Sequence, residues 1–178
     1  MKIGLLRHFK VKQPYPRKFL MAKSEVIRWF EDYEVAELEF QPVDLQNINW
    51  EICYSSSLNR AAVTANHIYP GEIVLVDALK ELDILHLLPD KIKLPFIFWA
   101  ILVRIKYASD AEAVRHFKQK IGEFADAVLR ENKNVLIVSH WFVMKVLETE
   151  LAKRKVVGAN VKSASYGKIY LFENSSSQ

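Results

Sequence analysis

The chain has 178 residues, of which 51% are apolar and 26% are charged, and its formal net charge is +4. This length suits one domain, residues 1–178, and the composition is that of an ordinary globular protein with a full core. The surplus of positive charge fits an anionic substrate, whereas the scattered basic residues form no stripe that would follow a nucleic-acid backbone. We therefore expect no nucleic-acid partner.

The chain has a single cysteine and no long apolar segment. Cys53 has no second thiol with which to form a disulfide or a metal site, which favours a reducing, cytoplasmic location. The longest apolar run, residues 94–103, has about half the length that spans a bilayer. The apolar stretch in residues 1–8 is too short for a secretory signal and ends at Arg7. We expect no membrane span.

Short apolar runs bounded by polar or turn residues predict five strands. In chain order they cover residues 2–6, 52–54, 73–76, 135–138 and 168–172. Apolar residues at helical spacing predict four helices between or after these strands. The first helix would follow Ser24, a candidate N-cap. The helical stretches are Val26 to Phe30, residues 58–68, residues 110–130 and Val143 to Leu151.

The alternation of strands and helices predicts an α/β fold, a three-layer α/β/α sandwich with a mostly parallel central sheet. Residues 84–107 interrupt this alternation between the third strand and the long helix. They are strongly apolar, and we expect them to form a small helical lid. The aromatic run Phe96, Phe98 and Trp99 would form either the core of the lid or a contact for an apolar substrate or partner. An exposed apolar lid would also offer a surface for a homodimer.

Three short segments bring arginine and histidine to the ends of predicted strands. They are Leu6-Arg7-His8, Tyr54-Ser55-Ser56-Ser57-Leu58-Asn59-Arg60-Ala61 and Val138-Ser139-His140. The carboxyl ends of parallel strands share one edge of a sheet, where ligands bind in open α/β folds. Two arginines at this edge offer planar forks of donors that match phosphate oxygens. A neutral imidazole is a nucleophile when an acceptor fixes its other nitrogen, and a second histidine can stabilise the transferring phosphoryl group.

The three segments resemble the histidine phosphatase superfamily, the phosphoglycerate-mutase-like group. Arg7-His8 is similar to its opening motif, residues 55–65 are similar to its Ser-Ser-x-Leu-x-Arg-Ala-x-x-Thr-Ala motif, and Ser139-His140 is similar to its late Ser-His motif. Lys80-Glu81-Leu82-Asp83 stands where the family carries its proton donor. The motifs occur in family order between about Leu5 and Trp141.

The resemblance implies a role for each matched position. His8 would be the nucleophile that becomes phosphorylated, and Arg7, Arg60 and His140 would bind the phosphate. Glu81 would protonate the leaving oxygen and then activate water, with Asp83 as the rival candidate. The implied reaction is the hydrolysis of a small phosphomonoester, and it needs neither a metal nor another cofactor.

The sequence departs from the family pattern next to both histidines. Phe9 and Trp141 stand where the family usually has glycine, which allows a close backbone approach. Two aromatic side chains at these positions would narrow the mouth of the pocket or form one wall of it, as substrate-binding residues. Residues 85–89 also replace the Gly-Glu-rich segment that is common after the proton donor, and His86 among them is a candidate for the pocket lining.

Two other functions remain open from the sequence. A phosphoglycerate mutase would share the fold but usually has a larger cap and a longer closing tail. A catalytically weak module that binds phosphate compounds or a partner would also keep the scaffold, and Phe9, Trp141 and the apolar lid favour this reading. The presence of Arg7, His8, Arg60 and His140 together argues for the phosphatase instead.

Overall fold

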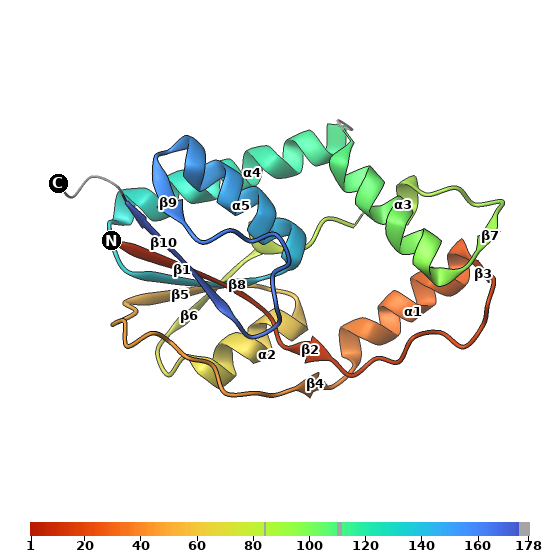
Figure 1. The fold of residues 1–178 in the computed structure, drawn as a ribbon, viewed down its shortest axis with the longest axis horizontal. Helices are drawn as coiled ribbons and strands as arrows, with labels where there is room; N and C mark the ends of the chain where they lie inside the picture. The colour runs from red at the N-terminus through yellow and green to blue at the C-terminus, as the bar shows by residue number, and fades with distance from the viewer. Residues whose placement is uncertain (84, 110–111, 175–178) are drawn as a thin grey trace.

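The computed structural model describes residues 1–83, 85–109 and 112–174. Within this part of the chain, a sheet of six strands has the order β6-β5-β8-β1-β10-β9 (Figure 1). These strands are β1 (Lys2–Arg7), β5 (Ile52–Ser56), β6 (Ile73–Val76), β8 (Val135–Ser139), β9 (Val156–Gly158) and β10 (Ile169–Asn174). The pairs β1/β8, β5/β8 and β5/β6 are parallel, whereas β10 runs antiparallel to β1 and to β9. The predicted α/β class with a mostly parallel sheet is confirmed.

Helices cover both faces of this sheet (Figure 1). On one face α4 (Glu112–Glu131) and α5 (Trp141–Lys153) pack over side chains such as Leu5 and Ile137. On the other face α2 (Asn59–Ile68) packs over the alternate set, which includes Leu6 and Val138. Alternate residues of a strand point to opposite faces, so the unbroken apolar runs of β1 and β8 serve both layers.

A further helical layer, named the lid below for its position, stands beyond the carboxyl ends of β1, β5 and β8 (Figure 1). It consists of α1 (Lys23–Val35) and α3 (Phe96–Ala108), joined by the antiparallel pair β3 (Met21–Ala22) and β7 (Lys93–Leu94). Its own apolar cluster includes Met21, Val26, Leu88 and Trp99, and the Trp99 Nε1 atom donates to the Met21 carbonyl at 2.9 Å. Residues 84–107, the segment expected to form a lid, contain β7 and most of α3, whereas α1 comes from an earlier part of the chain.

The start of α1 differs from the sequence expectation. The N-cap of this helix is Ala22 rather than Ser24, which lies exposed in the first turn. Pairing with β7 holds Met21 and Ala22 extended, so the helix begins directly after them. The carboxylate of Glu25 accepts a hydrogen bond from the Ala22 backbone N at 2.8 Å and satisfies one free donor at the helix start.

The remaining elements are short connections. They are β2 (Lys10–Val11), β4 (Leu38–Glu39) and two 3-10 helices, η1 (Asp77–Leu79) and η2 (Leu85–Leu87). The expected ends of the lid segment and of the long helix, Ile84 and Asp110, lie outside the described residues, as does the tail after Asn174. Among the described residues, no helix combines the length and the apolar character that crossing a membrane requires.

Candidate active site

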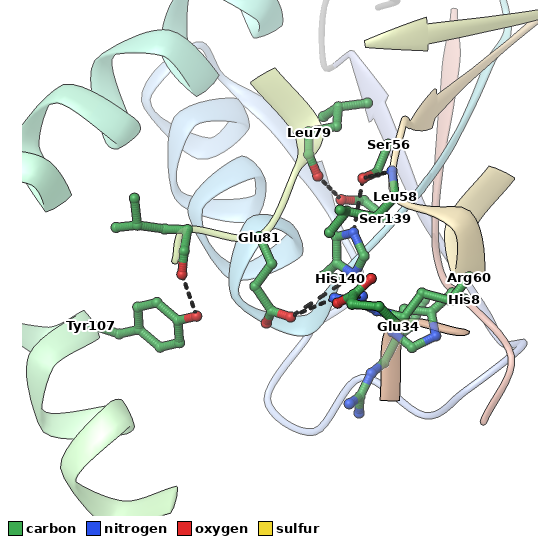
Figure 2. Close-up of polar contacts among 12 residues, drawn as sticks. His8, Glu34, Ser56, Leu58, Arg60, Leu79, Glu81, Tyr107, Ser139 and His140 are labelled. Atoms are coloured by element: carbon green, nitrogen blue, oxygen red, sulfur yellow. Dashed lines mark hydrogen bonds and ion pairs between the residues drawn. The ribbon is translucent and has the colours of Figure 1, made fainter. Parts of the chain in front are cut away.

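Figure 2 shows that His8, Arg60, Glu81 and His140, four of the candidate residues, lie together at the carboxyl ends of parallel strands. Arg7 is the last residue of β1 and lies in register with Ser139, the last residue of β8. His8 and His140 follow directly, and Arg60 lies in the first turn of α2 after β5. Glu81 approaches from the segment after η1. Five residues from four separate segments of the chain therefore surround one point at the edge of the sheet.

Two backbone contacts fix the orientation of His8. Its backbone N donates to the Ser139 carbonyl at 3.0 Å, and its Nδ1 lies 2.6 Å from the carbonyl oxygen of Phe9. A carbonyl oxygen only accepts, so Nδ1 carries the proton and donates, which leaves the lone pair on Nε2. The side chain is 2% exposed, and this burial, together with Arg60, lowers the pKa of His8 to about 3. The imidazole is consequently neutral near pH 7.

His140 lies against His8 in the same buried pocket. The two rings have centroids 5.1 Å apart, and the Nε2 atom of His140 lies 2.9 Å from the Ser56 hydroxyl. Burial is the main cause that holds the pKa of His140 well below its ordinary value, and Arg60 adds to it. Both rings are therefore neutral, and the fixed positive charges of the site reside on arginine.

Arg60 lies between two carboxylates. Its Nη1 atom is paired with Glu34 from α1, and its Nη2 donates to the Oε2 atom of Glu81 at 3.1 Å (Figure 2). The Arg60 side chain is only 5% exposed. The Arg60 guanidinium also lies 5.4 Å from the ring centroid of Tyr33, which belongs to α1 as Glu34 does. Arg60 thus links the lid helix α1 to the segment that carries Glu81.

The chain before the last strand positions Arg7. Its Nη1 donates to the Ala164 carbonyl at 3.1 Å and its Nη2 to the Tyr166 hydroxyl at 2.8 Å. The guanidinium also stacks on the Tyr166 ring, 3.8 Å from its centroid. Gly167 follows with a positive φ of 62° and donates from its backbone N to the Arg7 carbonyl at 2.9 Å. A glycine suits this left-handed turn because it lacks a Cβ.

Three polar atoms in this pocket lack hydrogen-bond partners. Across residues 1–83, 85–109 and 112–174, the buried side-chain atoms of this kind are Nε of Arg7, Nε of Arg60 and Nδ1 of His140. Buried donors in native proteins are normally paired, so three in one pocket mark a place for an acceptor. An oxyanion such as phosphate suits two guanidinium groups and an imidazole. In the same described residues, no cluster of three or more potential metal ligands occurs.

The surroundings of Glu81 shift its carboxyl group toward the protonated form. Burial raises its pKa, and the nearby charge of Glu34 acts in the same direction, while Arg60 and Arg7 oppose the shift. Its Oε2 lies 4.0 Å from Nδ1 of His140. The rival candidate Asp83 is exposed and accepts a hydrogen bond from the Leu85 backbone N at 3.0 Å, which is the contact of a turn residue. The geometry favours Glu81.

Phe9 does not lie where the sequence led us to expect. Its side chain is 0% exposed and packs beside Val11 and Leu38, with edge contacts to the rings of Phe40 and His67. The ring therefore forms no wall of the pocket, because the short pair β2/β4 supplies an apolar cluster that takes it. The backbone of Phe9 serves the site instead, through its carbonyl oxygen on His8.

Two other expected pocket residues point to the lid. Trp141 begins α5, packs on the main core and lies 6.0 Å from the guanidinium of Arg104 on α3. His86 lines an open cavity of about 430 Å³ with Lys23 and Asp83, and neither His8 nor Arg60 is part of that lining.

Sequence reasoning missed Glu34 and Tyr166. Glu34 stands among other acidic residues of α1, so nothing local distinguishes it from an ordinary solvated carboxylate. Tyr166 precedes Gly167, which lies just before the final strand. A glycine at this place indicates a tight turn next to the strand.

Comparisons with known proteins identify the family of this chain and support its fold. The family model of the histidine phosphatase superfamily (branch 1) matches residues 37–173. No curated protein matches the sequence. Among solved structures, a mutant phosphoserine phosphatase from Entamoeba histolytica in complex with phosphoserine superposes with a TM-score of 0.51, at 18% identity, over 98% of this chain and 96% of that chain. A phosphoserine phosphatase from the same organism in complex with 3-phosphoglyceric acid gives a TM-score of 0.48, at 19% identity, over 85% of this chain and 80% of that chain.

Proposed function

Since this chain belongs to the histidine phosphatase superfamily (branch 1), we propose that it hydrolyses a small phosphomonoester through a phosphohistidine formed on Nε2 of His8. The observation that carries the proposal is the contact of 2.6 Å between His8 Nδ1 and the Phe9 carbonyl. It directs the lone pair of a neutral imidazole away from the backbone, which is what a nucleophilic histidine requires.

The phosphate would bind through the unpartnered donors of the pocket. Nε of Arg7 and Nε of Arg60 are buried and free to donate to its oxygens. Nδ1 of His140 would add a third donor in the tautomer that protonates it. These groups spread charge over the transferring phosphoryl group, and such fixed donors are the main source of catalysis in phosphoryl transfer. The arginines supply the charge, so the proposed mechanism uses no metal or other cofactor.

In the first step, Nε2 of His8 attacks phosphorus and the bond from phosphorus to the leaving oxygen breaks. The leaving oxygen takes the proton of the Glu81 carboxyl, whose raised pKa keeps that proton available. The positive charge that develops on the imidazole is stabilised by the Phe9 carbonyl at Nδ1. In the second step, water gives a proton to the Glu81 carboxylate and attacks phosphorus. The bond to Nε2 breaks, and inorganic phosphate and neutral His8 result.

Transient labelling of the protein tests this proposal. We expect that incubation with a ³²P-labelled aryl phosphate, followed by a rapid quench, gives acid-labile phosphate on the wild-type chain. The variant His8→Ala should lose both labelling and turnover. The variant His116→Ala is the matched control, because His116 is exposed on α4, away from the pocket. Absence of labelling and equal activity of His8→Ala and wild type would refute the nucleophilic role.

A second candidate is a catalytically weak phosphate-binding module on the same scaffold. The pairing of Arg60 with Glu34 and Glu81 favours it, since both Nη atoms of this arginine already have acceptors. The same experiment separates the two functions, because the module would bind inorganic phosphate at micromolar concentration and release none from a phosphomonoester over hours.

We also propose a reducing compartment and a homodimer for this protein. The lone thiol of Cys53 is buried, which suits a reducing compartment such as the cytoplasm. Exposed apolar side chains on α3, among them Ile97 and Ile101, would be the surface of a homodimer. Sedimentation velocity of the wild type and of Ile101→Ser tests the assembly, and a monomer at all concentrations would exclude it.

A further inference from the structure

The site holds a carboxylate that the proposed reaction does not use. Glu34 comes from the C-terminal turn of α1, and its Oε1 is paired with Nη1 of Arg60 (Figure 2). In the part of the chain that the structure describes, Arg60 is the cation that contacts Glu34, and it is shared with Glu81. The Glu34 side chain is 38% exposed, so its carboxylate is accessible from solvent while it is paired with a buried guanidinium.

The charges of the pocket balance before substrate binds when Glu81 is ionised. Arg7 and Arg60 carry two positive charges, Glu34 and Glu81 can carry two negative charges, and low pKa values keep both histidines neutral. A phosphate dianion bound at Nε of Arg60 shares this guanidinium with Glu34. Even with a proton on Glu81, the bound complex then has more negative than positive charge. A positive charge on the part of the substrate that projects past Glu34 toward solvent offsets this excess of negative charge most directly.

We infer that Glu34 makes the site selective for phosphomonoesters whose leaving group carries an ammonium group close to the phosphate. The same carboxylate disfavours leaving groups that carry a carboxylate, because two like charges would then share the mouth of the pocket. Glu34 is a specificity-determining residue in this scheme and takes no part in bond making. The inference rests on the proposed function for its physiological meaning, but the charge preference itself concerns binding alone.

The excess negative charge of the bound complex is not offset by Tyr33 or by a further charge from Arg7. Tyr33 lies next to Glu34 in sequence and near Arg60, and burial raises its pKa, so its hydroxyl stays neutral. Arg7 is already engaged with Ala164 and Tyr166. When phosphate is bound to Arg60, a substrate ammonium group therefore contacts Glu34 without competition from Tyr33 or Arg7.

A matched series of two-carbon phosphonates tests the inference without any need for turnover. The ligands are 2-aminoethylphosphonate, ethylphosphonate and phosphonoacetate, which differ mainly in the charge of one group and are not hydrolysed. We expect the wild type to bind the amino compound about tenfold more tightly than the neutral one, and the carboxylate about tenfold more weakly, as single charge contacts near a surface allow. Titration calorimetry gives the three dissociation constants.

The variant Glu34→Gln should compress this range to within about threefold, mainly through tighter binding of phosphonoacetate. The matched control is Glu31→Gln, an exposed carboxylate on the same helix, which should leave the range unchanged. The corresponding phosphates, phosphoethanolamine, ethyl phosphate and phosphoglycolate, should show the same change in relative kcat/KM. Comparing each variant with wild type cancels the different intrinsic reactivity of the three leaving groups.

The outcomes distinguish failure of the role of Glu34 from failure of the proposed hydrolysis. An equal range of affinities in wild type and Glu34→Gln refutes the role of Glu34, whether or not the protein hydrolyses phosphates. An equal compression by Glu31→Gln refutes it as well, since any negative charge on α1 would then do the same. A charge preference with no turnover would support the inference on Glu34 and refute the proposed hydrolysis.

Discussion

The buried imidazole of His8 makes a testable link between pH and stability. Burial lowers its pKa from 6.5 to about 3 in the folded chain, whereas the unfolded chain leaves it near its ordinary value. Between these two values the unfolded state binds a proton that the folded state does not. The folded state is therefore favoured fully above the unfolded pKa, and this advantage falls as the pH drops from about 7 toward 3.

The size of the effect follows from the two pKa values. Between about pH 8 and pH 5, protonation of the unfolded imidazole lowers the free energy of unfolding by about 2 kcal/mol through His8 alone. His140 contributes in the same direction, because burial lowers its pKa as well. Glu81 opposes them, since its raised pKa means that the folded state holds the proton more tightly. The total pH dependence thus mixes several groups, and a variant is needed to isolate His8.

Urea denaturation of the wild type and of His8→Asn at both pH values isolates this share. The wild type should lose about 2 kcal/mol more than the variant between about pH 8 and pH 5, which corresponds to about 1 M in the urea midpoint. His116→Asn, a change at an exposed histidine, should behave like wild type. Equal pH dependence of wild type and His8→Asn would show that the imidazole titrates alike in both states. The assignment of a neutral, buried nucleophile would then be wrong.

Three substitutions test other parts of the site. Glu81→Gln should lower kcat/KM for an alkyl phosphate by about 10²–10⁴-fold and lower it far less for p-nitrophenyl phosphate, whose leaving group needs no proton; equal losses in kcat/KM would exclude a proton donor. Tyr166→Phe keeps the stacked ring but removes the acceptor for Nη2 of Arg7, so kcat/KM should fall about tenfold or more, and an unchanged value would contradict the positioning of Arg7. Phe9→Ala should lower the free energy of unfolding in urea by about 3–5 kcal/mol, as for a buried core ring, and a loss below about 1 kcal/mol would contradict its burial.

The central sheet was predictable because its information is local. The apolar runs of β1, β5, β6 and β8 are bounded by polar residues, and their predicted positions agree with the structure to within two residues. Arg7, His8 and His140 follow from the same reasoning, since they stand at the ends of those strands. Parallel pairing then brings the ends together without any further knowledge of packing.

The part of the lid that α1 forms, and its contribution to the site, were not predictable in this way. Two-residue strands such as β3 and β7 contain no periodicity, and their pairing joins Met21 to Leu94 across a long stretch of chain. Glu34 resembles its exposed neighbours in sequence and differs from them only through its contact with Arg60. The burial of Phe9 likewise depends on rings that other segments bring beside it, among them Phe40.

The separate apolar cluster of the lid affects how the protein can change over generations. Met21, Val26 and Trp99 pack mainly with one another, apart from the cluster that holds the sheet and α4 together. Substitutions within the lid can therefore shift α1, and with it the carboxylate above Arg60, while the strand ends that carry His8 and His140 stay in place. Related chains with the same residues at the strand ends would then be free to differ in the compounds they bind through changes in one small packing unit.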